Sequence, residues 1–351
     1  MNLPMINQVR ALWELCFDDS EAFTDLYFRL RYTDDVNIAL TEGGEVVSAL
    51  QMLPYPMTFG NSRIDTAYVS GACTHPAHRG RGLMRRLLAR AFEQMRSKGV
   101  AVSTLIPAEP WLFGYYAGVG YAPVFRRTTQ VFTASASTPL PPGTTFEAAE
   151  TNPDEAYHYL CRRLQERPCS ILHTEADFQV ILADLSLGGG HLFTLRRNGR
   201  ITALAVAYPQ NAEASTAGTR AWRIEQVEAD TAADRTNLLQ HACEALHVAA
   251  LDDALPTSHA GEGTPLGMAR IINAPDVLSL HAAAHPDLHA DFFLTDEQLP
   301  ANTARYTLQD GRCTQKKSTG QSVIDCPALT VGELTERLFG PLCPYMSLML
   351  N

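Results

Sequence analysis

The chain carries two kinds of hydrophobic pattern in its first hundred residues. Residues 3–16, 21–31 and 83–97 have apolar side chains at helical spacing, whereas residues 36–40, 46–53, 64–73 and 100–106 are β-prone runs. Asp18, Asp19 and Ser20 separate the first two helices and supply an N-cap, and Gly43-Gly44 marks a hairpin. We predict two helices, a hairpin, a strand, a helix and a final strand parallel to the previous one.

The same order of elements returns later in the chain. Helices are predicted over residues 153–166 and 174–186, a hairpin turn at Asn198-Gly199, a strand over 221–228 and a helix over 231–250. We interpret this segment as a second copy of the first unit. The alternative is that unrelated helices and hairpins share the order, which is a common one. The turn of the second copy, residues 227–231, is acidic and lacks glycine, so it is not expected to hold a pyrophosphate.

The remaining segments complete the predicted organisation. Residues 134–144 contain a small, polar and proline-rich stretch that we interpret as a linker. A third part has predicted helices over 276–285 and 331–339 and strands over 291–295, 305–308, 312–316 and 322–326. We therefore expect a mixed α/β (α+β) protein with domains at residues 1–133, 145–266 and 267–351.

Composition narrows the class of protein. The chain has 351 residues, 46% of them hydrophobic, and 28 Lys plus Arg against 38 Asp plus Glu, a formal net charge of −10. That length allows two or three domains with separate cores. The acidic balance argues against a nucleic-acid partner. No run approaches the ~20 apolar residues that span a bilayer, so we expect no membrane partner and a cytoplasmic location.

Metal and disulfide chemistry are not indicated. The eight cysteines include no Cys-x-x-Cys pair, so we expect reduced thiols and no zinc site. His281, His285 and His289 recur at four-residue intervals, but Pro286 interrupts the helical face that would align them. Cys73 has no base paired with it in the sequence, so we do not expect it to act as a nucleophile.

A basic, glycine-rich turn joins the predicted strand 64–73 to the predicted helix 83–97. Gly80 and Gly82 allow unusual dihedral angles and a close approach to a ligand, and the N–H groups that begin the helix attract an anion. The alternative is an ordinary turn with solvated arginines. The turn has neither the Gly-Lys-Ser/Thr of a Walker loop nor the three glycines of a dinucleotide fingerprint. The predicted cofactor-binding residues are Ala72, Cys73, Thr74, Arg79, Gly80, Arg81, Gly82, Leu83, Met84 and Arg85.

This turn resembles the acetyl-CoA signature of the GNAT acetyltransferase superfamily, Arg/Gln-x-x-Gly-x-Gly/Ala. Arg79, Gly80, Arg81 and Gly82 fit it, whereas Met84 departs from the last small position. The resemblance implies acetyl-CoA as co-substrate. It also implies a mixed sheet flanked by helices in each of two tandem GNAT-like domains, the second one degenerate.

The whole chain resembles the enhanced intracellular survival family, which adds a small C-terminal domain like a sterol carrier protein. The most specific pieces are the glycine turn, the run 115–121 (Tyr-Tyr-Ala-Gly-Val-Gly-Tyr) and the run 334–340 (Leu-Thr-Glu-Arg-Leu-Phe-Gly). The resemblance implies homo-oligomeric assembly, with a hexamer as the expected form. It also implies that the C-terminus returns to the active site.

The run 115–121 matches the superfamily's aromatic-Tyr-x-x-x-Gly-aromatic motif and places Tyr116 where the general acid sits. A phenol there can protonate the thiolate of coenzyme A as the carbon–sulfur bond breaks. Ordinary aromatic packing is the alternative, and we favour it for Tyr115 and Tyr121.

Two further catalytic and binding roles come from the resemblance. The free carboxylate of Asn351 would accept the proton of the attacking amine, and the apolar run 345–350 before it fits a docked terminus. The alternative is a terminus that only packs. Phe17 and Asp19 look like the family's Phe-x-Asp segment at the acceptor pocket, where Asp19 would pair with an ammonium group. Equally, Asp18 or Asp19 serves as a helix cap.

The leading hypothesis is therefore an acetyl-CoA-dependent N-acetyltransferase that transfers acetyl directly to a primary amine. The acceptor is a small cationic amine or a lysine-type amine, and no metal takes part. The competing hypothesis is a non-catalytic binding or scaffold protein that holds an apolar ligand in its sterol-carrier-like domain.

Overall fold

The computed structural model describes residues 4–135, 139–148, 152–210, 221–257, 259–317 and 326–349, and it confirms the order predicted for the first part. The elements are α1 (Met5–Cys16), α2 (Glu21–Leu30), β1 (Asn37–Glu42), β2 (Glu45–Phe59), β3 (Ser62–Thr74), α3 (Leu83–Ser97) and β4 (Val102–Leu105). Ser20 caps α2, since its side chain accepts a hydrogen bond from the N–H of Phe23. Because β4 runs parallel to β3, α3 is the crossover helix.

The second part repeats this topology. Its elements are α5 (Pro153–Gln165), α6 (Glu175–Leu187), β7 (His191–Arg197), β8 (Arg200–Pro209), β9 (Trp222–Ala229), α7 (Ala232–Ala245) and β10 (Ala250–Pro256). β9 and β10 are parallel, with α7 as their crossover. The elements between the two copies are α4 (Pro110–Ala117), β5 (Ala122–Thr133) and β6 (Thr144–Glu147).

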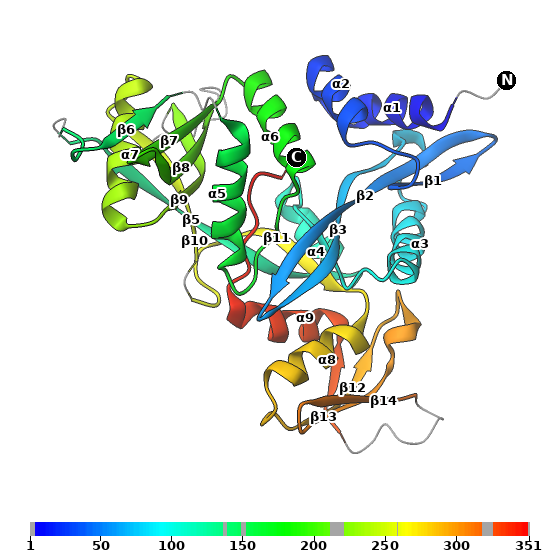
Figure 1. Ribbon diagram of the computed structural model, residues 1–351. Helices are drawn as coiled ribbons and strands as arrows, with labels where there is room; N and C mark the ends of the chain where they lie inside the picture. Colours follow the sequence, from blue (N-terminus) through cyan, green and yellow to red (C-terminus); the bar gives the residue numbers. More distant parts are fainter. Residues whose placement is uncertain are drawn as a thin grey trace.

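Both copies share one continuous sheet (Figure 1). It has 11 strands in the order β1-β2-β3-β4-β11-β5-β10-β9-β8-β7-β6, where β11 is Thr264–Ile271. β5 pairs with β10 of the second copy, and β11 lies between β4 and β5. β11 begins just before residue 267, the predicted start of the third domain, but it belongs to the large sheet.

The rest of the third part forms a smaller unit below the large sheet in Figure 1. Its elements are α8 (Ala274–Ala284), β12 (Ala290–Thr295), β13 (Ala304–Gln309), β14 (Arg312–Lys316), β15 (Ala328–Thr330) and α9 (Val331–Phe339), and its four strands pair in the order β14-β13-β12-β15. Residues 322–325 of the predicted strand 322–326 lie outside the described residues.

The chain then returns from α9 to the two copies. Figure 1 shows the red C-terminal segment passing between α5 and the strands of the first copy. The N–H of Tyr345 donates to the carbonyl of Cys169, and the N–H of Ile171 donates to the carbonyl of Tyr345, both at 2.9 Å. Tyr345, Met346, Ser347 and Leu348 are buried. The segment up to Met349 is therefore packed into the fold.

Alternate residues of β3 separate two apolar cores. Tyr68 packs with Trp13 of α1 on one face of the sheet, and Ala67 and Val69 pack with Leu87 of α3 on the other. In the described ranges, no helix is long and apolar enough to cross a membrane.

Candidate active site

The glycine turn has the backbone that the sequence suggested. After β3, a short 3-10 helix (Pro76–His78) leads to Gly80 and Gly82, whose φ angles are 76° and 70°. A Cβ at either position would meet no atom within 4 Å, so the left-handed backbone, and not lack of space, is what requires glycine. Gly82 is the N-cap of α3 and supplies no side-chain cap. The N–H groups that begin α3 therefore keep their capacity to bind an anion.

A cavity of about 380 Å³ lies beside this turn. That volume falls within the range of roughly 300 to 1,000 Å³ that is typical of ligand pockets. Its walls come from the end of β3, the glycine turn, the start of α3 and from α4. Of the predicted cofactor residues, those lining it are Ala72, Thr74, Arg79, Gly80, Gly82, Leu83 and Met84. Cys73, Arg81 and Arg85 are not among its lining residues. The structure adds His78, Trp111, Leu112 and Tyr115, which the sequence did not suggest.

Tyr116 lines the same cavity from α4. Its side chain is 8% exposed, and burial raises the pKa of its hydroxyl to about 12. The hydroxyl is therefore protonated at neutral pH, as a general acid must be. Tyr121 is buried and its hydroxyl lies 2.7 Å from Ser103 Oγ, in agreement with the packing role expected for it.

β3 and β4 stop pairing with each other beside this cavity. β3 and β4 pair only from Thr66 opposite Val102 to Tyr68 opposite Thr104. β3 continues to Thr74, whereas β4 ends at Leu105. The last residues of β3 are thus not paired with β4, and an extended amide-bearing arm can hydrogen-bond there as a strand would.

Arg81 is held by an acidic partner on the neighbouring hairpin. Its Nη1 and Nη2 donate to the two carboxylate oxygens of Glu42, each at 2.9 Å, and this guanidinium lowers the pKa of Glu42. His78 Nδ1 lies 2.9 Å from Arg81 Nη1. Arg81 therefore fixes the tip of the turn against the end of β1.

Arg79 turns back toward the end of β3. Its Nε donates to the carbonyl of Thr74 at 3.1 Å, and its Nη2 lies 3.9 Å from Cys16 Sγ. A hydrogen bond with Cys73, together with Arg79, lowers the pKa of Cys16 to about 6. The hydrogen bond with Cys16 and burial raise the pKa of Cys73 well above its usual value. Cys73 is thus a poor nucleophile, which fits direct transfer.

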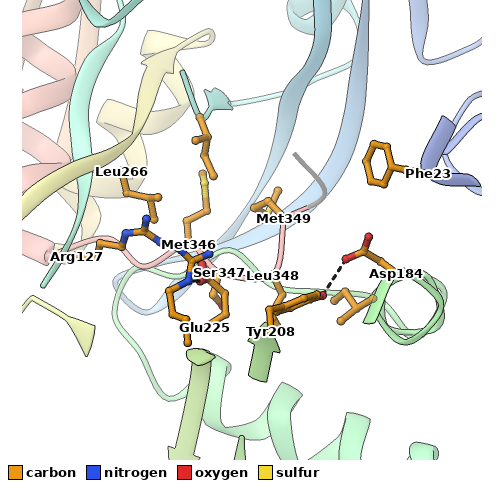
Figure 2. A pocket seen from close by; sticks show the side chains of 13 residues that line it. Phe23, Arg127, Asp184, Tyr208, Glu225, Leu266, Met346, Ser347, Leu348 and Met349 are labelled. Atoms are coloured by element: carbon orange, nitrogen blue, oxygen red, sulfur yellow. Dashed lines mark hydrogen bonds and ion pairs between the residues drawn. The ribbon is translucent and has the colours of Figure 1, made fainter. Parts of the chain in front are cut away.

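A second cavity, of about 340 Å³, lies between the two copies (Figure 2). It is lined by Phe23 of α2, by Ile106 just after β4, by Asp184 of α6 and by residues 346–349 of the C-terminal segment. Asn351, the predicted base, lies outside the described residues. Met349 is the last described residue before it.

The predicted acceptor residues lie elsewhere. Asp19 is exposed, and one of its carboxylate oxygens accepts from Trp13 Nε1 at 2.8 Å. Phe17 packs against the same indole, with ring centroids 4.8 Å apart. Neither residue lines either of the two cavities.

The two cavities lie on opposite faces of the sheet. Tyr116 belongs to the core on the α3 face, whereas Ile106 and Phe23 pack against the core on the α1 and α2 face. Each cavity also adjoins the place where β3 and β4 part, through Ala72 on one side and Ile106 on the other. A donor and an acceptor bound in them would approach from opposite faces of the sheet.

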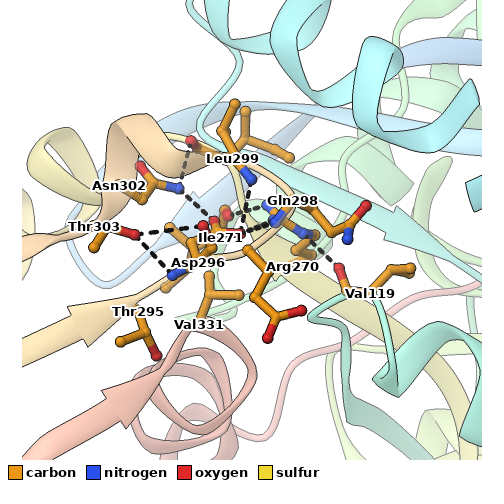
Figure 3. A network of polar contacts seen from close by, with 12 residues as sticks. Val119, Arg270, Ile271, Thr295, Asp296, Gln298, Leu299, Asn302, Thr303 and Val331 are labelled. Carbon is orange, nitrogen blue, oxygen red and sulfur yellow. Dashed lines mark hydrogen bonds and ion pairs between the residues drawn. The ribbon is translucent and has the colours of Figure 1, made fainter. Parts of the chain in front are cut away.

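A buried arginine fixes the loop that follows Tyr116 (Figure 3). Arg270 of β11 is fully buried, and its Nε donates to the carbonyl of Val119 at 2.9 Å. Its Nη2 pairs with Asp296 at 2.5 Å, and its guanidinium lies 4.1 Å from the ring centroid of Phe92. The contact is close, because a Cβ on Gly120 would lie 3.1 Å from Arg270 Nε. Arg270 thus joins the small unit to the α4 loop.

Comparison with protein families adds one finding about sequence. Residues 3–124 match the family described as acetyltransferase (GNAT) domain. The chain carries a GNAT acetyltransferase domain. The match covers the end of β3, the glycine turn, the start of α3 and α4, which together form the first cavity. A search of curated proteins finds no match.

Solved structures share the fold along most of the chain. A GCN5-related N-acetyltransferase from Anabaena variabilis has a TM-score of 0.74 at 14% identity, over 99% of this chain and 98% of that one. One from Kribbella flavida has a TM-score of 0.72 at 17% identity, over 100% and 97%. Eis1 from Mycobacterium abscessus has a TM-score of 0.69 at 15% identity, over 95% and 87%. At these identities the likeness concerns the fold.

The GNAT domain makes this protein an acyltransferase. The second copy keeps the topology but lacks the anion-binding cradle, that is, a glycine turn before a helix start without a side-chain cap. Thr231 instead caps α7 by accepting a hydrogen bond from the N–H of Asp234. Asp234 is itself buried and paired with Arg197. Within the described ranges, no group of three or more His, Cys, Asp or Glu side chains is placed to hold a metal ion.

Proposed function

We propose that the protein is an acetyl-CoA-dependent N-acetyltransferase that transfers acetyl directly to a primary amine. The observation that carries the proposal is the first cavity, in which the glycine cradle and the protonated Tyr116 line one space. The cradle suits a pyrophosphate because two positive-φ glycines precede an uncapped helix start. The open edge of β3 suits the pantetheine arm, which places a thioester between the two cavities.

The proposed chemistry is a single displacement at the thioester carbonyl. The amine nitrogen forms a bond to the acetyl carbon, and the carbon–sulfur bond breaks with its electron pair on sulfur. The Tyr116 hydroxyl gives its proton to that sulfur, and the attacking nitrogen loses one proton to a base. An N-acetylated amine and free coenzyme A result.

We propose the Asn351 carboxylate as this base. The described segment before it supports the idea, because residues 346–349 line the second cavity, on the face from which the acceptor would come. An α-carboxyl is a weak base, with a pKa of about 3.5, so burial has to raise its pKa for this role.

The cofactor site can be tested by calorimetry. An Arg81→Ala/Gly82→Asp double variant should bind acetyl-CoA about 100-fold more weakly, because it loses a cation and places a carboxylate at the start of α3. Arg90→Ala is the matched control, since Arg90 is exposed on α3 away from the cavity, and it should bind normally. Equal affinity in all three folded proteins would refute the cofactor site.

The base can be tested by moving the terminal carboxylate. Adding Gly-Ser after Asn351 should lower kcat by about 10²-fold while acetyl-CoA affinity stays the same, because only the proton acceptor is displaced. Steady-state thiol release measures the first quantity and calorimetry the second. An extended protein with full turnover would exclude Asn351 as the base.

The remaining features are proposed by resemblance. The acceptor is a small amine or a lysine-type amine, the protein acts in the cytoplasm, and its assembly is homo-oligomeric. Sterol-carrier likeness of the third part is proposed in the same way. The alternative, an apolar-ligand binding protein, is not favoured, because Leu294, Tyr306 and Leu308 of the small sheet are buried in one core with α8 and α9.

A further inference from the structure

The cavity between the two copies contains an unpaired carboxylate. Asp184 accepts a hydrogen bond from the Tyr208 hydroxyl at 2.9 Å. Among the described residues it has no cationic partner, and burial raises its pKa. Keeping a half-buried carboxylate charged without a counter-ion costs free energy, and a cation bound from solution would offset that cost.

The other carboxylate of this cavity is already neutralised. Glu225 pairs with Arg127 at 3.3 Å and with Arg223 at 2.8 Å. The side chains of these two arginines are 30% and 35% exposed, and both line the cavity beside Glu225. Figure 2 shows Arg127 and Glu225 across the cavity from Asp184. The unpaired negative charge of the cavity is therefore at the Asp184 end.

Apolar side chains separate Asp184 from the acetyl-transfer end of the cavity. Ile106 marks that end, because it directly follows the last residue of β4. Leu266, Leu348 and Met349 contribute to the walls. Phe23 and Ala183, the residue before Asp184, pack against the same small apolar cluster, so the ring of Phe23 lines the Asp184 end of the cavity.

We propose that this cavity binds the acceptor, and that the acceptor is a diamine: one amine reacts at the Ile106 end while a second, protonated amino group binds Asp184. The inference rests on the proposed acetyltransferase activity. An apolar chain between the two nitrogens matches the cavity wall. Asp184 lies in the second copy, which thereby contributes specificity although it lacks a cofactor cradle.

The test compares three acceptors with the same number of carbon atoms, six: hexamethylenediamine, hexylamine and ε-aminocaproate. The wild-type protein should acetylate the diamine with a kcat/KM at least about 10-fold above that of hexylamine, since a charge-assisted contact forms only with the diamine. Asp184→Asn keeps the shape and the contact to Tyr208, and it should remove this preference. The kcat/KM for hexylamine should stay unchanged, because hexylamine has no group that reaches Asp184.

Glu175→Gln is the matched control, since it removes an exposed carboxylate from the same helix. It should keep the diamine preference. Two results would overturn the proposal. One is an equal loss of kcat/KM for hexamethylenediamine and hexylamine in Asp184→Asn. The other is a wild-type preference for ε-aminocaproate, which would assign specificity to Arg127 and Arg223. If no amine is acetylated, the proposed function fails instead. Binding of hexamethylenediamine by calorimetry, weakened by Asp184→Asn but not by Glu175→Gln, then still decides the cavity assignment.

Discussion

Replacing Tyr116 with phenylalanine is expected to lower kcat by about 10²-fold or more while the affinity for acetyl-CoA stays the same. The change deletes one hydroxyl from a cavity wall that otherwise keeps its shape. Without that hydroxyl, coenzyme A must leave as an unprotonated thiolate or be protonated by a water molecule. Tyr116 is only 8% exposed, so its ring packing contributes to stability, and phenylalanine retains that packing.

Tyr115→Phe is the matched control for this experiment. Tyr115 lines the same cavity and precedes Tyr116 on α4, with ring centroids 5.4 Å apart. Its variant should turn over at nearly the wild-type rate. Thiol release measures kcat, and calorimetry measures acetyl-CoA affinity. Equal losses in the two variants, or normal turnover in Tyr116→Phe, would show that the cavity uses no acid at this position.

The pH profile adds a second readout. Burial raises the pKa of Tyr116 to about 12, so the acid stays protonated from neutral pH to pH 10. A raised tyrosine pKa means that the protonated form is lost only at higher pH. Tyr116 should therefore cause no decline of kcat below pH 10. Any alkaline decline that the wild-type protein shows in that range should also be present in Tyr116→Phe.

Local signals predicted the elements that surround the first cavity. Two glycines with positive φ, an N-cap at Ser20 and a parallel crossover through α3 follow from short-range patterns, and each is present. The repeat of topology was also readable, because the hairpin and crossover signals recur in order. Tyr116 was placed by its motif, and the structure locates it in the same cavity as the glycine turn.

Long-range pairing was not readable from the sequence. β5 and β11 carry no distinctive alternation, and they became strands because each is paired on both sides within the large sheet. Asp184 and Ile106 are 78 positions apart in the chain, so nothing local indicates that they line one cavity. For Phe17 and Asp19 a local motif suggested a binding role, and that role stays a prediction. The structure adds a contact that the motif did not indicate, a hydrogen bond from Trp13 Nε1 to Asp19.

Replacing Arg270 with methionine is expected to lower the free energy of unfolding by about 3–5 kcal/mol, because it leaves the buried Asp296 without its cation. Asp296 would keep hydrogen bonds from the N–H groups of Gln298 and Leu299, which do not neutralise its charge. Denaturant unfolding measures the loss. Burial lowers the pKa of Arg270, yet the carboxylate beside it favours the charged form, so the pair acts as a unit.

The exposed pair Arg305 and Asp291 provides the matched control within the same unit. Their side chains are 35% and 38% exposed, so Arg305→Met should cost about 0–1 kcal/mol. Arg270 also donates to the carbonyl of Val119, three residues after Tyr116. Arg270→Met should therefore lower kcat at a temperature where it is still fully folded, whereas Arg305→Met should not. A stability loss with unchanged kcat would assign Arg270 to joining the units alone, without a part in positioning Tyr116.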